Sequence, residues 1–176
     1  AEVMKHAKDD MAVVVKTNMH DGYKGGVSME EGIEIARNIW SHGVHGIILS
    51  AGTVSRTPML ILGGAMPHKT LAHYMDTRKF WWLKMGLAIA GKIVIPPTDY
   101  RKLYFLDWAK EFKKALPEAN FIYVGGVESR ATAETVLNEG FELFQIGHVL
   151  IEDPAFVNHM KEGGDDYCSQ CKRSNY

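Results

Sequence analysis

Short β-branched runs alternate with capped helical segments along this chain, and that alternation limits its possible folds more than any other feature. The first run, Met11–Lys16, is apolar up to its lysine and has no polar alternation. This pattern is typical of a parallel strand covered on both faces, so we expect a central strand there. Three later runs have the same character: His45–Ser50, Asn120–Val124 and Glu142–Ile146.

Helical segments follow these runs. Ser28 and Glu31 have the spacing of a capping box, and the apolar residues after them recur at three-to-four spacing until Gly43, a left-handed helix terminator. Three more helices are expected: Asp107–Leu116 stopped by Pro117, Ser129–Asn138 ended by Gly140, and one with Pro154 at its first position after an Asp153 cap.

Repeated β/α units imply parallel strands joined by right-handed crossovers, which form either a barrel or an open doubly wound sheet. A closed (β/α)8 barrel needs roughly 250 residues, so four units amount to half of one. Between 52 and 103 the pattern fails, and we interpret this stretch as a functional insertion. The predicted organisation is a half barrel over 1–163 and a tail over 164–176.

Composition narrows the class of protein. With 176 residues and 46% hydrophobic content, the chain can bury one domain. Its 20 Lys and Arg nearly balance 21 Asp and Glu and are scattered, which disfavours nucleic acid as a partner. No apolar run suits a membrane span or signal peptide, so we expect no membrane association and a cytoplasmic location. Ala1–Lys8 resembles the tail of a helix entered midway, which is compatible with a chain cut from a longer protein.

Two turns after predicted strands could bind an anion. Gly125 and Gly126 lie between a buried strand and a Ser-capped helix, where a phosphate can approach the backbone closely. Gly147 and His148 end the next strand, as in barrels whose phosphate site is built by the loops after the last two strands. Alternatively, the glycines only permit tight turns and His148 is a surface or core histidine.

Two further features are candidates for chemistry. Lys16 ends a strand where barrel active sites lie, and a buried lysine there would need an anionic partner, although lysines more commonly reach solvent. The only two cysteines, Cys168 and Cys171, form a C-x2-C pair that could supply half the ligands of an iron–sulfur or zinc site. They trail the last helix, which disfavours a thioredoxin-like motif and leaves inert thiols as the alternative.

Five segments together resemble strands five to eight of the NADH:flavin oxidoreductase (Old Yellow Enzyme) family: Val15–Asn18, Asp21–Gly26, Ile48–Gly52, Tyr123–Val127 and Gln145–Pro154. The later cysteine pair is similar to the branch containing 2,4-dienoyl-CoA reductase, where cysteines hold a 4Fe–4S cluster. The resemblance implies a (β/α)8-barrel C-terminal half that binds FMN. Lys16 would contact flavin N1 and O2, the residues of the two turns (Gly125, Gly126, Gly147 and His148) would bind the phosphate, and Cys168 and Cys171 would be cluster ligands in a longer parent chain.

The resemblance also implies an activity: hydride transfer from NAD(P)H through FMN to an electron-poor small-molecule acceptor. Two departures stand out, because the family usually has arginine where His148 stands, and its substrate-orienting residues lie upstream of strand five. A half barrel would expose sheet edges and an apolar face, so we expect a homo-oligomer. The rival hypotheses are a non-catalytic half-barrel fragment and a flavin-free enzyme that binds a sugar phosphate.

Overall fold

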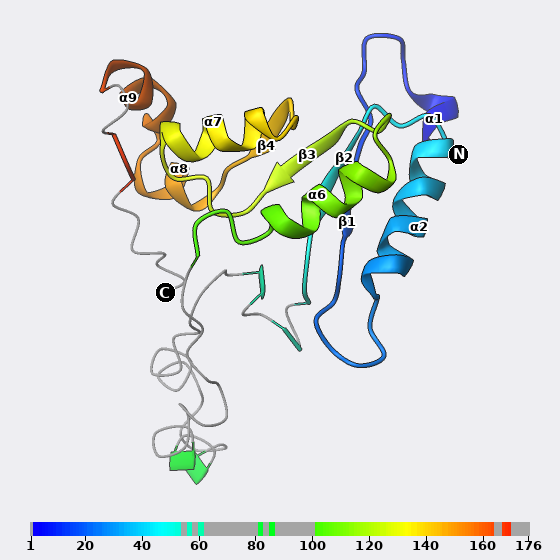
Figure 1. Ribbon diagram of the computed structural model, residues 1–176, viewed down its shortest axis with the longest axis horizontal. Coiled ribbons are helices and arrows are strands. Elements are labelled where there is room, and N and C mark those ends of the chain that lie inside the picture. Colours follow the sequence, from blue (N-terminus) through cyan, green and yellow to red (C-terminus); the bar gives the residue numbers. More distant parts are fainter. Residues whose placement is uncertain are drawn as a thin grey trace.

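The computed structural model describes residues 2–53, 56–57, 60–61, 81–82, 85–86, 101–163 and 167–169. In these residues four strands form one sheet, with helices between them along the chain (Figure 1). Most of the predicted insertion at 52–103, and Cys171 in the predicted tail, lie outside the described residues.

The four strands are all parallel, in the order β1-β2-β3-β4. Lys16 pairs with Ile48, Ile48 with Ile122, and Ile122 with Leu143, so these residues form one row across the sheet. Each strand overlaps its predicted run, although β1 extends past Lys16 to Asn18, and the predicted parallel β/α class is confirmed. The bounds are β1 Val14–Asn18, β2 Gly46–Ser50, β3 Phe121–Val124 and β4 Leu143–Gln145.

The first strand differs from its prediction. The expectation of a central strand at Met11–Lys16 is wrong for the described sheet, because β1 lies at one end of the strand order. Val14 is 42% exposed, and Lys16 is exposed as well. A β-branched run indicates a strand, but it does not reveal whether both faces are covered, since coverage depends on distant elements.

The helical segments follow from local capping. At Ser28, the hydroxyl accepts from the Glu31 amide at 3.2 Å and the Glu31 carboxylate accepts from the Ser28 amide at 2.9 Å, as predicted. Gly43 and Gly140 have φ of 80° and 84° after the helices that they were predicted to end. The helices are α1 Glu2–His6, α2 Met29–Ser41, α6 Leu106–Ala115, α7 Arg130–Asn138, α8 His148–Glu152 and α9 Phe156–Glu162.

The last two helices differ from those predicted from the sequence. Pro154 is not the first residue of a helix, because α9 begins at Phe156 with Ala155 as its N-cap. Asp153 instead ends α8, and its carboxylate accepts from the Ala155 amide at 3.0 Å. Helix α8 was not predicted, because five residues are too few to show a helical period.

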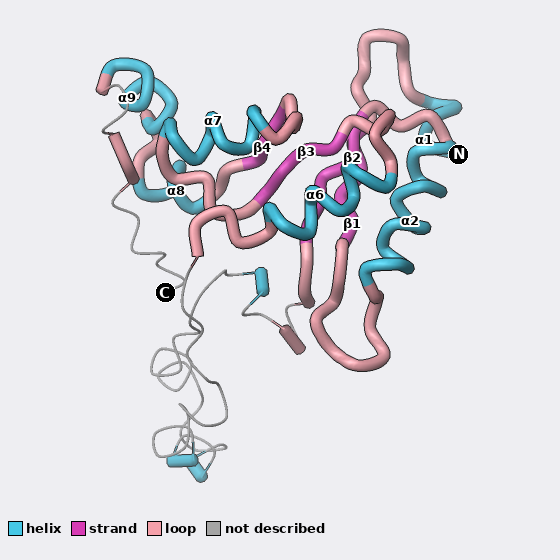
Figure 2. The backbone as a smooth tube through the Cα atoms, in the orientation of Figure 1, coloured by secondary structure: helices cyan, strands magenta, loops and turns pink. Residues whose placement is uncertain are grey.

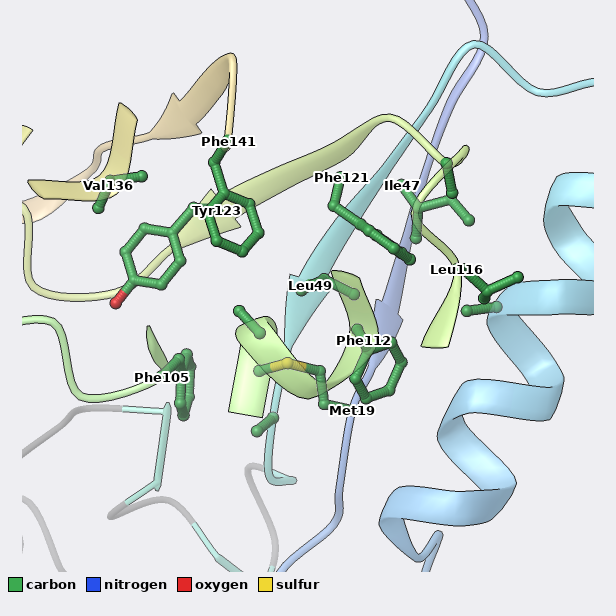
Figure 3. Close-up of a cluster of buried hydrophobic side chains, with 14 of the residues drawn as sticks. Met19, Ile47, Leu49, Phe105, Phe112, Leu116, Phe121, Tyr123, Val136 and Phe141 are labelled. Atoms are coloured by element: carbon green, nitrogen blue, oxygen red, sulfur yellow. The ribbon is translucent and has the colours of Figure 1, made fainter. Parts of the chain in front are cut away.

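The core lies between one face of the sheet and helices α2, α6 and α7 (Figure 3). Ile47, Leu49, Phe121 and Tyr123 alternate along β2 and β3 and are nearly or fully buried on that side, against residues such as Phe112. The opposite face is more open in the described part of the chain, where Leu143 is 60% exposed.

Loops and turns connect the strands to these helices at both ends of the sheet (Figure 2). None of the described helices is both long enough and apolar enough to cross a membrane.

Candidate functional site

A pocket of about 250 Å³ lies at the carboxyl ends of β3 and β4. Its lining includes all five residues that the sequence analysis assigned to cofactor binding, namely Lys16, Gly125, Gly126, Gly147 and His148. Lys16 comes from the middle of β1, not from its end as predicted, whereas the other four come from the turns after β3 and β4, up to 132 positions away in the chain (148 minus 16). The tertiary structure therefore brings the predicted set together in one place.

The first wall of the pocket is the turn after β3. Gly125 and Gly126 have φ of 121° and 73°, a region that favours glycine. A Cβ on Gly125 would lie 3.0 Å from the Phe105 ring and 3.1 Å from the Tyr104 ring, so side chains crowd this turn as well. The buried Tyr123 hydroxyl donates to the Gly125 carbonyl at 2.6 Å. The turn is thus held in one shape by its own strand.

The start of α7 contributes less to this wall than its sequence suggested. The Thr132 hydroxyl oxygen accepts from the amides of Glu128 and Ser129 at 3.0 and 2.9 Å. The Ser129 hydroxyl in turn accepts from the Thr132 amide at 3.3 Å. The amides of Glu128, Ser129 and Thr132 are thus already occupied, and no residue of α7 lines the pocket, so an anion there would depend mainly on the glycine turn.

The second wall follows β4. Gly147 is the N-cap of α8 and His148 is its first residue, and both are exposed. The next residue, Val149, is 6% exposed, so one side of the short helix α8 is buried. The imidazole of His148 can donate or accept a hydrogen bond, and it adds positive charge only when protonated.

Lys16 lines the pocket from the open face of the sheet. Its side chain is exposed, so the requirement for a buried counter-charge does not apply in the described part of the chain. The residue shares its row with Ile48 and Ile122, and Ile122 lies two residues before the end of β3, where the glycine turn begins. A fixed cation at this place would face a ligand that extends from the pocket along the sheet.

Three polar residues of the pocket lining were not predicted from the sequence, namely Tyr104, Glu128 and Gln145. Glu128 is 15% exposed at its side chain and pairs with Lys102 at 2.9 Å, which offsets a negative charge beside the glycine turn. Leu103, with φ of 52°, donates its amide to the Gly126 carbonyl at 3.4 Å. Glu128 and Gln145 could have been found from their places beside predicted turns, whereas Tyr104 carries no local signal.

The structure describes one of the two predicted metal ligands. Cys168 is a free, half-buried thiol in an isolated antiparallel bridge with Ser129, and Cys171 lies outside the described residues. Among the residues that are described, no group of three or more His, Cys, Asp or Glu side chains could hold a metal ion. A cluster at these cysteines therefore stays a prediction.

A polar group lies behind the second wall. The Asp153 carboxylate accepts from the Tyr167 hydroxyl and lies 2.7 Å from Nδ1 of His159. The hydrogen bond from Tyr167, followed by that from His159, holds the pKa of Asp153 below its ordinary value. The same hydrogen bond is the main reason that the pKa of Tyr167 is raised to about 12. At neutral pH the pair is therefore a carboxylate and a neutral phenol.

A parallel β/α sheet with a glycine-turn pocket at its strand ends belongs to the class of α/β folds that bind ligands at that edge. The chain is similar to 4,4'-dithiodibutanoate disulfide reductase of Rhodococcus erythropolis, at 27% identity over 97% of this chain and 42% of that protein. It thus spans less than half the length of this curated relative. No protein-family model matches the chain.

A solved structure shows the same fold. A 2-naphthoyl-CoA reductase in complex with 2-naphthoyl-CoA is similar with a TM-score of 0.68 at 20% identity, over 99% of this chain and 21% of that one. Together with the four parallel strands, this likeness supports a fold of parallel β/α units of the TIM-barrel type. Both similar proteins carry the name of a reductase.

Proposed function

We propose that this chain is the FMN-phosphate-binding part of a flavin-dependent oxidoreductase similar to the Old Yellow Enzyme family. The observation that carries the proposal is the single pocket lined by all five residues chosen from the sequence. Similarity over nearly the whole chain to two proteins named as reductases supports the oxidoreductase class. In this proposal 1–163 form the C-terminal half of a barrel, with an insertion at 52–103, and 164–176 form a cysteine-bearing tail.

The donors in the pocket suit a flavin mononucleotide. The turn at Gly125 and Gly126 is a concave backbone surface where a phosphate can come close, since neither residue has a Cβ. His148 and Gly147 would hold the phosphate from the other wall, and Lys16 would face the N1 and O2 edge of the ring. Bound FMN supplies hydride chemistry, and these residues bind and orient it.

The parent protein would pass hydride from NAD(P)H through FMN to an electron-poor acceptor. The substrate-orienting residues of such a protein would lie outside this chain, so the isolated chain is proposed to bind flavin and not to turn over. Cys168 and Cys171 would be two of the ligands of a 4Fe–4S cluster completed by further residues. A second copy, or the rest of the barrel, would cover the open sheet face that includes Leu143.

The test compares FMN with riboflavin, which lacks only the phosphate. Titration of the purified chain, followed by flavin fluorescence and absorption, should give FMN an affinity at least about tenfold tighter, because charge-assisted hydrogen bonds at the phosphate are lost with riboflavin. Equal affinities would remove the pocket as a phosphate site. A chain that binds no flavin at all would contradict the proposal and favour a fragment without catalysis or a sugar-phosphate-binding barrel.

The role of Lys16 can be tested separately. Lys16→Met should weaken the binding of reduced FMN about tenfold more than that of oxidised FMN, because negative charge at N1 develops only on reduction. The measurement is the midpoint potential of the bound flavin, which should fall. Lys114→Met, an exposed position on α6, is the matched control and should leave the potential unchanged. An unchanged potential in Lys16→Met would place the amine away from the ring.

A further inference from the structure

The segment Tyr167–Ser169 makes hydrogen bonds to the loop after β3 and to the end of α8, which belong to the two walls of the pocket. We propose that this segment, called the strap below, holds the loop Gly125–Ser129 and the segment Gly147–Asp153 at the separation that a phosphate-bearing ligand requires. The strap residues act as positioning residues, since none of them lines the pocket. The expected effect on FMN affinity rests on the proposed function, whereas the expected effect on the spacing of the two walls does not.

Ser169 links the two walls directly. Its amide donates to the carbonyl of Glu128 at 2.9 Å, in the loop after β3. Its hydroxyl donates to the Glu152 carboxylate at 2.6 Å, at the end of α8. One residue therefore makes a hydrogen bond to each wall, and its two bonds together fix their spacing.

The walls need such a link because the strands beneath them stop pairing. The last paired residues of β3 and β4 are Val124 and Gln145, and the pocket turns begin immediately after them. Beyond that point the backbone ladder no longer sets the distance between the two turns. Cys168 extends the strap along the first wall through its antiparallel bridge with Ser129, the N-cap of α7.

Tyr167 anchors the strap at its other end. Its hydroxyl donates to Asp153, the C-cap of α8, and its ring lies 5.8 Å from the fully buried Phe156 ring. A Cβ on Gly163 would lie 3.1 Å from the Tyr167 Cβ, so the close return of the strap toward α9 requires a small residue there. The anchor combines an apolar contact with a charge-assisted hydrogen bond, which is the stronger kind.

Two substitutions weaken the strap without removing its packing. Ser169→Ala removes the hydroxyl bond to Glu152, and Tyr167→Phe keeps the ring and removes the bond to Asp153. Each should weaken FMN about five- to tenfold, the cost typical of one hydrogen bond, and should leave riboflavin within about twofold. Ser41→Ala is the matched control, because it removes a 2.8 Å serine hydrogen bond to Asn38 at the far end of α2 and should change neither affinity.

Amide hydrogen exchange provides a readout that needs no ligand. In the unliganded Ser169→Ala and Tyr167→Phe variants, amides of Val127–Ser129 should exchange about five- to tenfold faster, while those of α2 should not change. If the wild-type chain binds no FMN, the proposed function fails, and the strap is judged by exchange alone. Unchanged exchange then overturns it.

Other outcomes are equally decisive when FMN binds. A selective loss of FMN affinity with faster exchange at the loop supports the strap. Unchanged FMN affinity overturns it, whatever the exchange rates. Equal losses of FMN and riboflavin, together with a lower melting temperature, overturn it as well, because they indicate a general role in stability.

Discussion

The free energy of unfolding of the Asp21→Ala variant is expected to be about 3 kcal/mol lower than that of the wild-type chain. The substitution removes a buried charged acceptor and leaves its two donors without it. Asp21 is 8% exposed, and its carboxylate accepts from the side chain of Asn18 and the amide of Val27, each at 2.9 Å. Asn18 also donates to the Gly52 carbonyl at 2.8 Å. Through the side chain of Asn18, this network links the loop after β1 to the loop after β2.

Urea unfolding followed by circular dichroism measures this loss. The matched control is Asp107→Ala, because the Asp107 side chain is 82% exposed and its ion pair with Arg101 spans 3.8 Å. A surface pair of this kind contributes less than about 1 kcal/mol. If the two variants lose equal stability, the network around Asp21 does not stabilise the fold.

The loss at Asp21 should also depend on pH. The amide of Val27, followed by the Asn18 side chain, lowers the pKa of Asp21 from its ordinary value of 3.8. Because the folded pKa lies below the unfolded one, the carboxylate contributes its full stability above the unfolded value. This contribution is lost as the pH falls through the folded pKa, so the two chains should converge in strong acid. A difference that persists unchanged at acidic pH would contradict this origin.

The Gly32→Ala variant is expected to lose about 2 kcal/mol of unfolding free energy, although alanine is the better helix former by up to about 1 kcal/mol. Gly32 is buried within α2, and a Cβ there would overlap the backbone carbonyl oxygen of Met19 and lie 3.1 Å from the Phe112 ring. A backbone carbonyl at the end of β1 cannot move as a flexible side chain can. The helix would have to shift away from the sheet.

Thermal and urea unfolding of Gly32→Ala test this expectation. Asn38→Ala is the control in the same helix, since Asn38 is exposed and alanine there should be neutral or slightly stabilising. A more stable Gly32→Ala variant would mean that helix propensity outweighs the close contact, and that α2 has room to move against Met19.

Local chemistry explains what could be predicted. The capping box at Ser28 and the terminators Gly43 and Gly140 satisfy or end helices through contacts within a few residues, so the sequence shows them directly. The glycine turn after β3 was predicted for the same reason, since Gly125 and Gly126 form the turn themselves. The five residues assigned to cofactor binding were chosen as strand-end residues, and parallel strands bring such ends to one edge.

Spacing and local hydrogen bonds were enough to predict the strands, their parallel class, the capping box at Ser28 and the glycine terminators, but not the start of α9. The packing of distant elements, by contrast, put β1 at one end of the described sheet. It also decided that Tyr104 lines the pocket and that Ser169 joins both of its walls. These are contacts whose partners or coverage are set by how distant elements pack, and no periodicity encodes that packing.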